Sequence, residues 1–235
     1  MPSVPDVIAI VPAAGIGSRM QALLPKQYLT IGDKTLLEHA IGVLLSQTCI
    51  RQVIVAINPA DRWYERLPIA TNPRVHAVTG GKIRATSVMA ALRGGFSATW
   101  VLVHDAVRPC LHQDDLCRLL AITTHTDVGG LLASPVRDTM KRANSHTNIV
   151  AHTVDRVDLW HAMTPQLFTR DLLKNSLERA LREGATVTDE ASAIEYCTYA
   201  PLLVTGRSDN VKVTYPEDLA LARFFFSQLS NTENI

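Results

Sequence analysis

Short apolar runs alternate with segments of helical periodicity along most of the chain. The runs are rich in Val, Ile and Leu and have the length of buried strands. The segments between them repeat apolar residues every three or four positions, as one buried helix face requires. This alternation predicts an α/β fold, with a mostly parallel sheet and helices on both faces. Strands are expected at 6–12, 52–57, 74–78, 99–104, 127–133 and 200–205, and helices at 35–46, 84–94, 113–122, 169–183, 189–196 and 216–228.

Residues 135–160 interrupt this alternation. Two β-like runs flank the polar turn at 144–148, which is the signal of a β-hairpin. A two-stranded ribbon is only marginally stable by itself in water. We therefore expect an arm at 136–159 that packs on a second subunit and makes a homodimer.

Length, charge and cysteine spacing argue against a nucleic-acid-binding, membrane-spanning or zinc protein. A chain of 235 residues is long enough for one large α/β domain or two small ones. The formal net charge of +1 gives no strong field toward nucleic acid or a membrane surface. No apolar run is long enough to span a bilayer, and we read no signal peptide. The four cysteines lack Cys-x-x-Cys spacing, which favours reduced thiols in a cytoplasmic protein over a zinc site.

The loop after the first apolar run carries the clearest chemistry. Small residues at 13–17 leave backbone N–H groups open to an oxygen-rich ligand, and Arg19 and Lys26 add two cations. This combination is typical of a triphosphate site. A Walker loop is excluded because Lys26 comes too late, and a dinucleotide fingerprint is disfavoured because Met20 replaces the third glycine.

Two further segments have both a functional and a structural interpretation. Gly80-Gly81 precedes a predicted helix on which Arg84 and Ser87 lie on adjacent turns, which fits a base-recognition loop or an ordinary strand-to-helix turn. Asp105 and Arg108 follow a buried strand, at the sheet edge where ligands bind. Asp105 is suited to Mg²⁺, but the two residues also fit a simple ion pair.

The remaining polar residues are less specific. Asp209 and Lys212 fit a second metal ligand and a phosphate clamp, or an exposed strand of alternating charge. Thr139, Arg156 and Thr164, in or next to the arm, fit a site for a second, phosphorylated substrate, or plain surface polarity. The acids at 189–190 are interpreted as a helix N-cap with an acidic first turn.

Together these motifs resemble the 2-C-methyl-D-erythritol 4-phosphate cytidylyltransferase family of the non-mevalonate isoprenoid pathway. The resemblance runs across nearly the whole chain and follows one order. Its motifs are Pro12-Ala13-Ala14-Gly15-x-Gly17-x-Arg19-Met20, Pro25-Lys26-Gln27, His104-Asp105-Ala106-Val107-Arg108-Pro109, Pro135-Val136-x-Asp138-Thr139, Thr153-x-Asp155-Arg156-x-x-Leu159-Trp160, Thr164-Pro165-Gln166, Thr188-Asp189-Glu190-Ala191 and Asn210-Val211-Lys212-Val213-Thr214.

The resemblance implies a Rossmann-like, three-layer nucleotidyltransferase fold over 1–235, with a twisted sheet and a protruding β-arm. It implies CTP, a methylerythritol phosphate and Mg²⁺, with Asp105 on the metal and Asp209 as a second candidate ligand. The catalytic candidates are Arg19, Lys26, Arg156 and Lys212, with Arg156 reaching the site of a partner subunit. Candidates near CTP are Ala13, Ala14, Gly15, Gly17, Gly81, Arg84, Ser87 and Ala106. Candidates near the second substrate are Asp105, Arg108, Thr139, Arg156, Thr164 and Lys212.

Two alternatives share this fold. One is a cytidylyltransferase for another polyol or sugar phosphate, such as ribitol 5-phosphate. The other is a non-catalytic nucleotide-binding protein, which would be expected to lack Arg19, Lys26 or Asp105, and all three are present. The chain also departs from the resembled family at Lys82, where an acid is common, and this affects the expected ribose or base contacts at that position.

Overall fold

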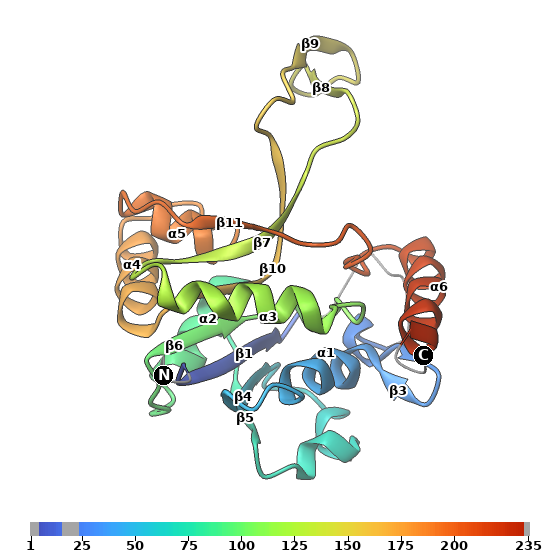
Figure 1. Cartoon of the computed structure of the whole chain (residues 1–235), viewed down its shortest axis with the longest axis vertical. Coiled ribbons are helices and arrows are strands. Elements are labelled where there is room, and N and C mark those ends of the chain that lie inside the picture. Colours follow the sequence, from blue (N-terminus) through green and yellow to red (C-terminus); the bar gives the residue numbers. More distant parts are fainter. Residues whose placement is uncertain (1–4, 16–23, 233–235) are drawn as a thin grey trace.

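A seven-stranded sheet forms the centre of the molecule (Figure 1). The computed structural model describes residues 5–15 and 24–232. The strand order is β11-β7-β10-β6-β1-β4-β5. The strands are β1 (Val7–Ala13), β4 (Ile50–Ile57), β5 (Val75–Thr79), β6 (Trp100–Val103), β7 (Gly129–Pro135), β10 (Trp160–Thr169) and β11 (Leu202–Thr205).

The sheet is mostly parallel, as the alternation predicted. β1 pairs in parallel with β4 and β6, β4 with β5, and β7 with β11. β10 runs antiparallel between β6 and β7 and was missing from the predicted strands. Pro165 explains the omission, because a proline lacks the N–H that a central strand needs. The pairing of β10 with β7 shifts register between Ala162 and Gln166, and this irregularity accommodates the proline.

Helices cover both faces of the sheet and give the predicted three layers. In β1, Val7, Ala9 and Val11 pack on one face, while Ile8 and Ile10 pack on the other. Side chains of α1 and α3 join the first cluster, and those of α2, α4 and α5 join the second. The helices are α1 (Leu36–Leu45), α2 (Arg84–Arg93), α3 (Gln113–Ala121), α4 (Arg170–Arg182), α5 (Glu190–Tyr196) and α6 (Pro216–Thr232).

Smaller elements complete the body. α6 closes a third apolar cluster, in which Ala222 joins Val107 and Val213. The short strands and 3₁₀ helices are β2 (Thr30–Ile31), β3 (Lys34–Thr35), η2 (Lys26–Tyr28), η3 (Tyr64–Arg66), η4 (Pro68–Thr71) and η5 (Ile122–Thr124). Within the described residues, no helix has the length and apolar character needed to cross a bilayer.

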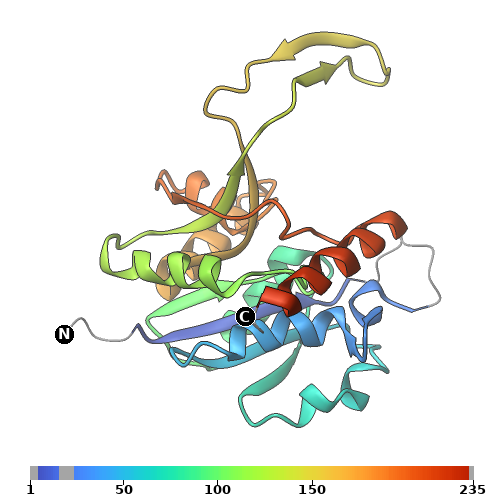
Figure 2. The same cartoon turned by 45° about the vertical axis from the view of Figure 1, so that its right-hand side comes forward.

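The predicted hairpin is confirmed and extends away from the body (Figures 1 and 2). β8 (Met140–Ala143) pairs antiparallel with β9 (Val150–Val154) in a separate two-stranded sheet. β7 ends and β10 begins at its base, where Pro135 lies opposite Trp160. The arm is therefore continuous with two strands of the central sheet.

The strand order reverses beside β1. The chain proceeds from β1 to β4 and β5 on one side and then returns to β6 on the other. Loops leaving the carboxyl ends of β1 and β6 diverge at such a reversal, and open α/β sheets bind ligands there. The loop at residues 13–15 and the loop at 104–108 both begin at this point.

Candidate functional site

A cleft of about 400 Å³ lies at the carboxyl ends of β1 and β6. It brings together residues from the loops after β1 and β6, the start of α2 and the segment before α6. Among its lining residues are ten predicted from the sequence: Ala13, Ala14, Gly15, Lys26, Gly81, Arg84, Ser87, Asp105, Ala106 and Lys212. Predicted residues separated by up to two hundred positions in the chain thus share one cavity.

The Gly81 loop is held in shape by the start of α2. The Ser87 hydroxyl is buried and accepts a hydrogen bond from the Gly81 N–H at 3.1 Å. A Cβ added to Gly81 would lie 2.1 Å from Thr86 Oγ1, so a side chain cannot be placed there without displacing Thr86. The contact of Ser87 with a base stays a prediction. Within the protein, the hydroxyl fixes the backbone that lines the cleft.

Lys26 reaches the cleft from η2. Its Nζ donates to the carbonyl oxygen of Val213 at 3.1 Å, next to Lys212. The neighbouring Gln27 is buried, and its Nε2 donates to the carbonyl oxygen of Ala13 at 2.8 Å. Gln27 was not singled out from the sequence as a site residue, yet it joins the turn that carries Lys26 to the end of β1.

Asp105 is the electrostatic centre of the cleft. Its carboxylate is almost fully buried and faces Lys212 Nζ at 2.9 Å, Arg84 Nε at 3.2 Å and Arg108 Nε at 3.5 Å. Burial alone would raise the pKa of Asp105, but the charges of Arg84, Lys212 and Arg108 hold it well below its usual range. Asp105 is therefore a permanent anion surrounded by cations.

Thr164 and His104 hold the backbone of Asp105. The Thr164 hydroxyl accepts from the Asp105 N–H at 3.0 Å and contacts His104 Nδ1 at 3.1 Å. His104 Nε2 donates to the carbonyl oxygen of Arg108 at 3.1 Å. Burial lowers the pKa of His104 to about 4, so the ring is neutral and its Nδ1 accepts the Thr164 proton.

Arg108 and Asn210 connect this loop to the segment carrying Lys212. Arg108 Nη1 donates to the carbonyl oxygen of Asn210 at 2.5 Å. Asn210 is fully buried, and its Nδ2 donates to the carbonyl oxygen of Thr164 at 2.9 Å. The sequence analysis assigned no role to Asn210, which lies between the candidates Asp209 and Lys212. In the structure it links β10 to the segment carrying Lys212.

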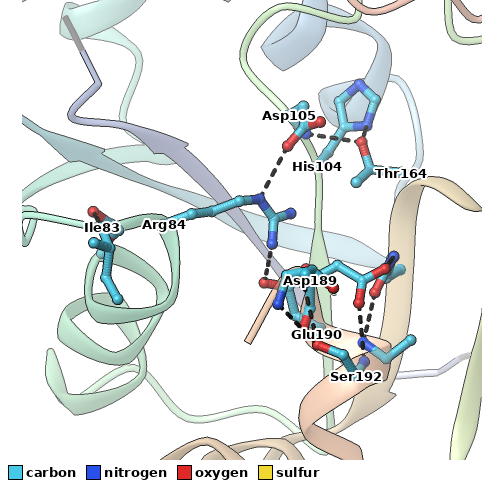
Figure 3. A network of polar contacts seen from close by, with 12 residues as sticks. Ile83, Arg84, His104, Asp105, Thr164, Asp189, Glu190 and Ser192 are labelled. Atoms are coloured by element: carbon cyan, nitrogen blue, oxygen red, sulfur yellow. Dashed lines mark hydrogen bonds and ion pairs between the residues drawn. The ribbon is translucent and has the colours of Figure 1, made fainter. Parts of the chain in front are cut away.

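Arg84 lies between two acids (Figure 3). Its Nε faces Asp105, and its Nη1 lies 2.5 Å from Glu190 Oε1. The predicted N-cap is confirmed: Asp189 accepts from the Ser192 N–H at 2.9 Å. The acidic-first-turn interpretation of Glu190 was incomplete, because its side chain is buried and paired with Arg84.

Other candidates lie elsewhere. Asp209 pairs with Arg207 at 2.6 Å and His112 at 3.3 Å and lines a different cavity from Asp105, and its role as a second metal ligand stays a prediction. Thr139 and Arg156 are exposed on the arm and do not line the cleft of their own chain. Gly17 and Arg19 lie outside the described residues.

The cleft offers a divalent cation a single carboxylate. Within residues 5–15 and 24–232, no group of three or more His, Cys, Asp or Glu side chains could enclose a metal ion. Mg²⁺ is commonly held by one or two carboxylates together with phosphate oxygens of a nucleotide. Asp105 fits this arrangement, because it is ionised and lies among residues that line the cleft.

The buried hydroxyl of Thr164 gives a testable consequence. We expect Thr164→Val to lower the free energy of unfolding by about 1–3 kcal/mol, because it leaves the Asp105 N–H without its acceptor. Thr164→Ser keeps the hydroxyl and is the matched control. Urea unfolding of both variants measures the difference, and equal stabilities would show that the hydrogen bond contributes nothing.

Comparison with known proteins gives a consistent result. The family model of 2-C-methyl-D-erythritol 4-phosphate cytidylyltransferase matches residues 7–228. The enzyme of that name from Sodalis glossinidius is 73% identical over 231 residues, which cover 98% of this chain and 97% of the relative.

Solved structures agree over nearly the same length. A crystal structure of 4-diphosphocytidyl-2C-methyl-D-erythritol synthase has a TM-score of 0.80 at 38% identity, covering 94% of this chain and 98% of that one. The Francisella tularensis 2-C-methyl-D-erythritol 4-phosphate cytidylyltransferase has a TM-score of 0.82 at 31% identity, covering 94% and 99%. The order of the motifs, the arrangement of the cleft and these matches together place the chain in the 2-C-methyl-D-erythritol 4-phosphate cytidylyltransferase family.

Proposed function

We propose that this protein transfers CMP from CTP to 2-C-methyl-D-erythritol 4-phosphate and releases pyrophosphate. The observation that carries the proposal is the cleft that collects Lys26, Lys212, Arg84 and Asp105 beside open backbone at Ala13–Gly15, in a chain of this family. Such a site suits a triphosphate, because small residues with accessible backbone and cationic side chains line it together.

The chemistry needs little proton transfer. The substrate phosphate is already anionic, so its oxygen attacks the α-phosphorus of CTP directly. A new P–O bond forms there as the bond to the leaving pyrophosphate breaks, which gives 4-diphosphocytidyl-2-C-methyl-D-erythritol. Two polyanions must meet, and the protein's task is therefore to neutralise charge and align the reacting groups.

The cationic side chains divide this task. Lys26 and Arg19 are assigned to the triphosphate, where they offset charge at the α-phosphorus and on pyrophosphate. Arg108 and Lys212 are assigned to the incoming phosphate; both lie within 3.5 Å of the Asp105 carboxylate. Ala13, Ala14, Gly15, Gly81, Ser87 and Ala106 are assigned to CTP, as is Gly17 from its place in the motif. Asp105 would hold Mg²⁺, which when bound supplies further positive charge to the triphosphate oxygens.

We also propose that the chain is one cytidylyltransferase domain whose arm, residues 136–159, makes a homodimer. Met140, Ile149, Val150 and Val157 are large apolar side chains exposed on or beside this two-stranded ribbon. Exposed apolar groups on a ribbon with no core of its own favour contact with another surface. Dimerisation would also explain Thr139 and Arg156, which do not line the cleft of their own chain yet belong to the family motifs.

A cytoplasmic location is part of the same proposal. All four cysteines, at 49, 110, 117 and 197, are free. Free thiols are typical of proteins that work in a reducing compartment.

The reaction is tested by pyrophosphate release from CTP and Mg²⁺ with a panel of phosphates: methylerythritol 4-phosphate, ribitol 5-phosphate and a sugar 1-phosphate. We expect turnover with the first only, because the motif residues match that family. Faster release with ribitol 5-phosphate would favour the alternative acceptor. CTP binding without release on any acceptor would favour a non-catalytic nucleotide-binding protein.

Lys26→Ala and Arg19→Ala test the assignment of charge. Each is expected to lower kcat by about 10²–10³-fold while CTP still binds, since removal of one preorganised cation costs on the order of 3–4 kcal/mol of barrier. Lys26→Arg should restore activity only in part, because a planar fork cannot replace a point charge. Steady-state kinetics and CTP titration measure both quantities, and near-normal turnover in both alanine variants would refute the assignment.

The arm is tested by deletion and by mixing. A chain lacking 138–158 is expected to be monomeric in light scattering, and an unchanged dimer would count against the arm.

Mixing inactive Lys26→Ala and Arg156→Ala dimers tests whether Arg156 serves the cleft of the partner subunit or that of its own chain. If Arg156 serves the partner's cleft, subunit exchange restores about a quarter of wild-type activity, because half of the dimers are mixed and each mixed dimer has one intact site. No recovery after demonstrated exchange would place Arg156 in its own chain's site.

A further inference from the structure

Glu190 is a buried acid without a part in the chemistry proposed above. Its side chain is 1% exposed, and its Oε1 faces Arg84 Nη1. Its Oε2 has no hydrogen-bond partner among the described residues. Burying an ion pair seldom stabilises a fold more than apolar packing would, because both charges lose their hydration. The presence of Glu190 beside a cleft residue therefore calls for another explanation.

Arg84 connects this acid to the cleft. It is the first residue of α2, lines the cavity, and directs different nitrogens of one guanidinium toward Asp105 and Glu190 (Figure 3). A planar guanidinium with several N–H donors can bind two carboxylates at once, which a lysine ammonium does less well. Asp105 follows β6 and Glu190 begins α5, so Arg84 bridges two elements.

The position of Glu190 is fixed by its neighbours. Asp189 caps α5 by accepting from the Ser192 N–H. Gln166, which is buried in β10, donates to Asp189 Oδ2 at 2.9 Å and accepts from the Ala191 N–H at 2.9 Å. The residues on both sides of Glu190 are thus attached to the central sheet, Asp189 through its side chain and Ala191 through its backbone N–H. A rigid anion at this point holds the guanidinium in place.

We propose that Glu190 is a positioning residue that shares Arg84 with Asp105 and so keeps the Asp105 carboxylate able to accept a cation carried by the nucleotide. Two carboxylates compete for one guanidinium. Without the charge on Glu190, Arg84 would interact with Asp105 alone, where Lys212 and Arg108 already lie. An incoming metal ion would then compete with a more strongly held set of cations. This inference rests on the proposed assignment of the cleft to CTP and Mg²⁺.

The test is direct binding of CTP by calorimetry as a function of Mg²⁺ concentration. Glu190→Gln keeps the shape and one hydrogen-bond acceptor but removes the charge. We expect the Mg²⁺ concentration needed for half-maximal CTP binding to rise about tenfold, and the same substitution to have no effect in an Arg84→Met background, because contacting residues couple in double-mutant cycles. Glu38→Gln is the matched control: Glu38 is a buried acid in the capping box of α1 and lines a different cavity, so the Mg²⁺ dependence should not change.

Three results would overturn the inference. These are an unchanged Mg²⁺ dependence in Glu190→Gln, a shift of equal size in the Arg84→Met background, and the same shift in Glu38→Gln. Should Glu190→Gln not fold, Glu190→Asp keeps the charge but withdraws it from Arg84, and a folded aspartate variant with wild-type Mg²⁺ dependence would be equally decisive. Failure of the wild-type protein to bind CTP with Mg²⁺ would instead refute the assignment of the cleft.

Discussion

The buried carboxylate of Asp105 is the constraint on which the site depends. It attracts Lys212, Arg84 and Arg108 from three different parts of the chain. Without an anion at this point, three cations so close together would repel one another, and each would favour a more exposed position. Asp105 therefore permits the protein to hold, in advance of substrate, the concentration of positive charge that two polyanions require.

The role of the Asp105 carboxylate also explains why hydrogen bonds fix the backbone of the loop that carries it. A charge that organises three partners must itself be placed accurately, since electrostatic preorganisation is effective only when the groups do not reorganise during the reaction. The Thr164 hydroxyl, the neutral ring of His104 and the carbonyl of Arg108 form one hydrogen-bonded chain around the Asp105 loop. Asn210 extends that chain to the segment carrying Lys212. Hydrogen bonds among neutral polar residues thus determine where the charged residues lie.

Sequence reasoning succeeded where a local pattern carries the information. All six predicted helices and six of the strands of the main sheet follow from apolar periodicity, and the hairpin follows from two β-like runs around a polar turn. β10 was not predicted, because Pro165 lacks the backbone N–H that a central strand normally uses for pairing. Its surroundings override that argument: the register shift leaves the proline outside regular pairing, while Leu167 and Phe168 remain fully buried.

The site was predicted less completely, for a related reason. Motifs identify which residues carry charge, but not which partners each one meets across the fold. Arg84 and Glu190 are 106 positions apart, and nothing near Glu190 distinguishes it from an ordinary acid in the first turn of a helix.

Gln27 follows the predicted site residue Lys26, and Asn210 follows Asp209. Both are buried, and the spacing of the motifs does not predict this burial. Residues that position a site are harder to predict than residues that form it, because their chemistry is directed inward. The unpaired oxygen of Glu190 is a feature that only the folded structure reveals. Because a buried ion pair adds little stability, we infer that Glu190 is buried in order to share Arg84 with Asp105.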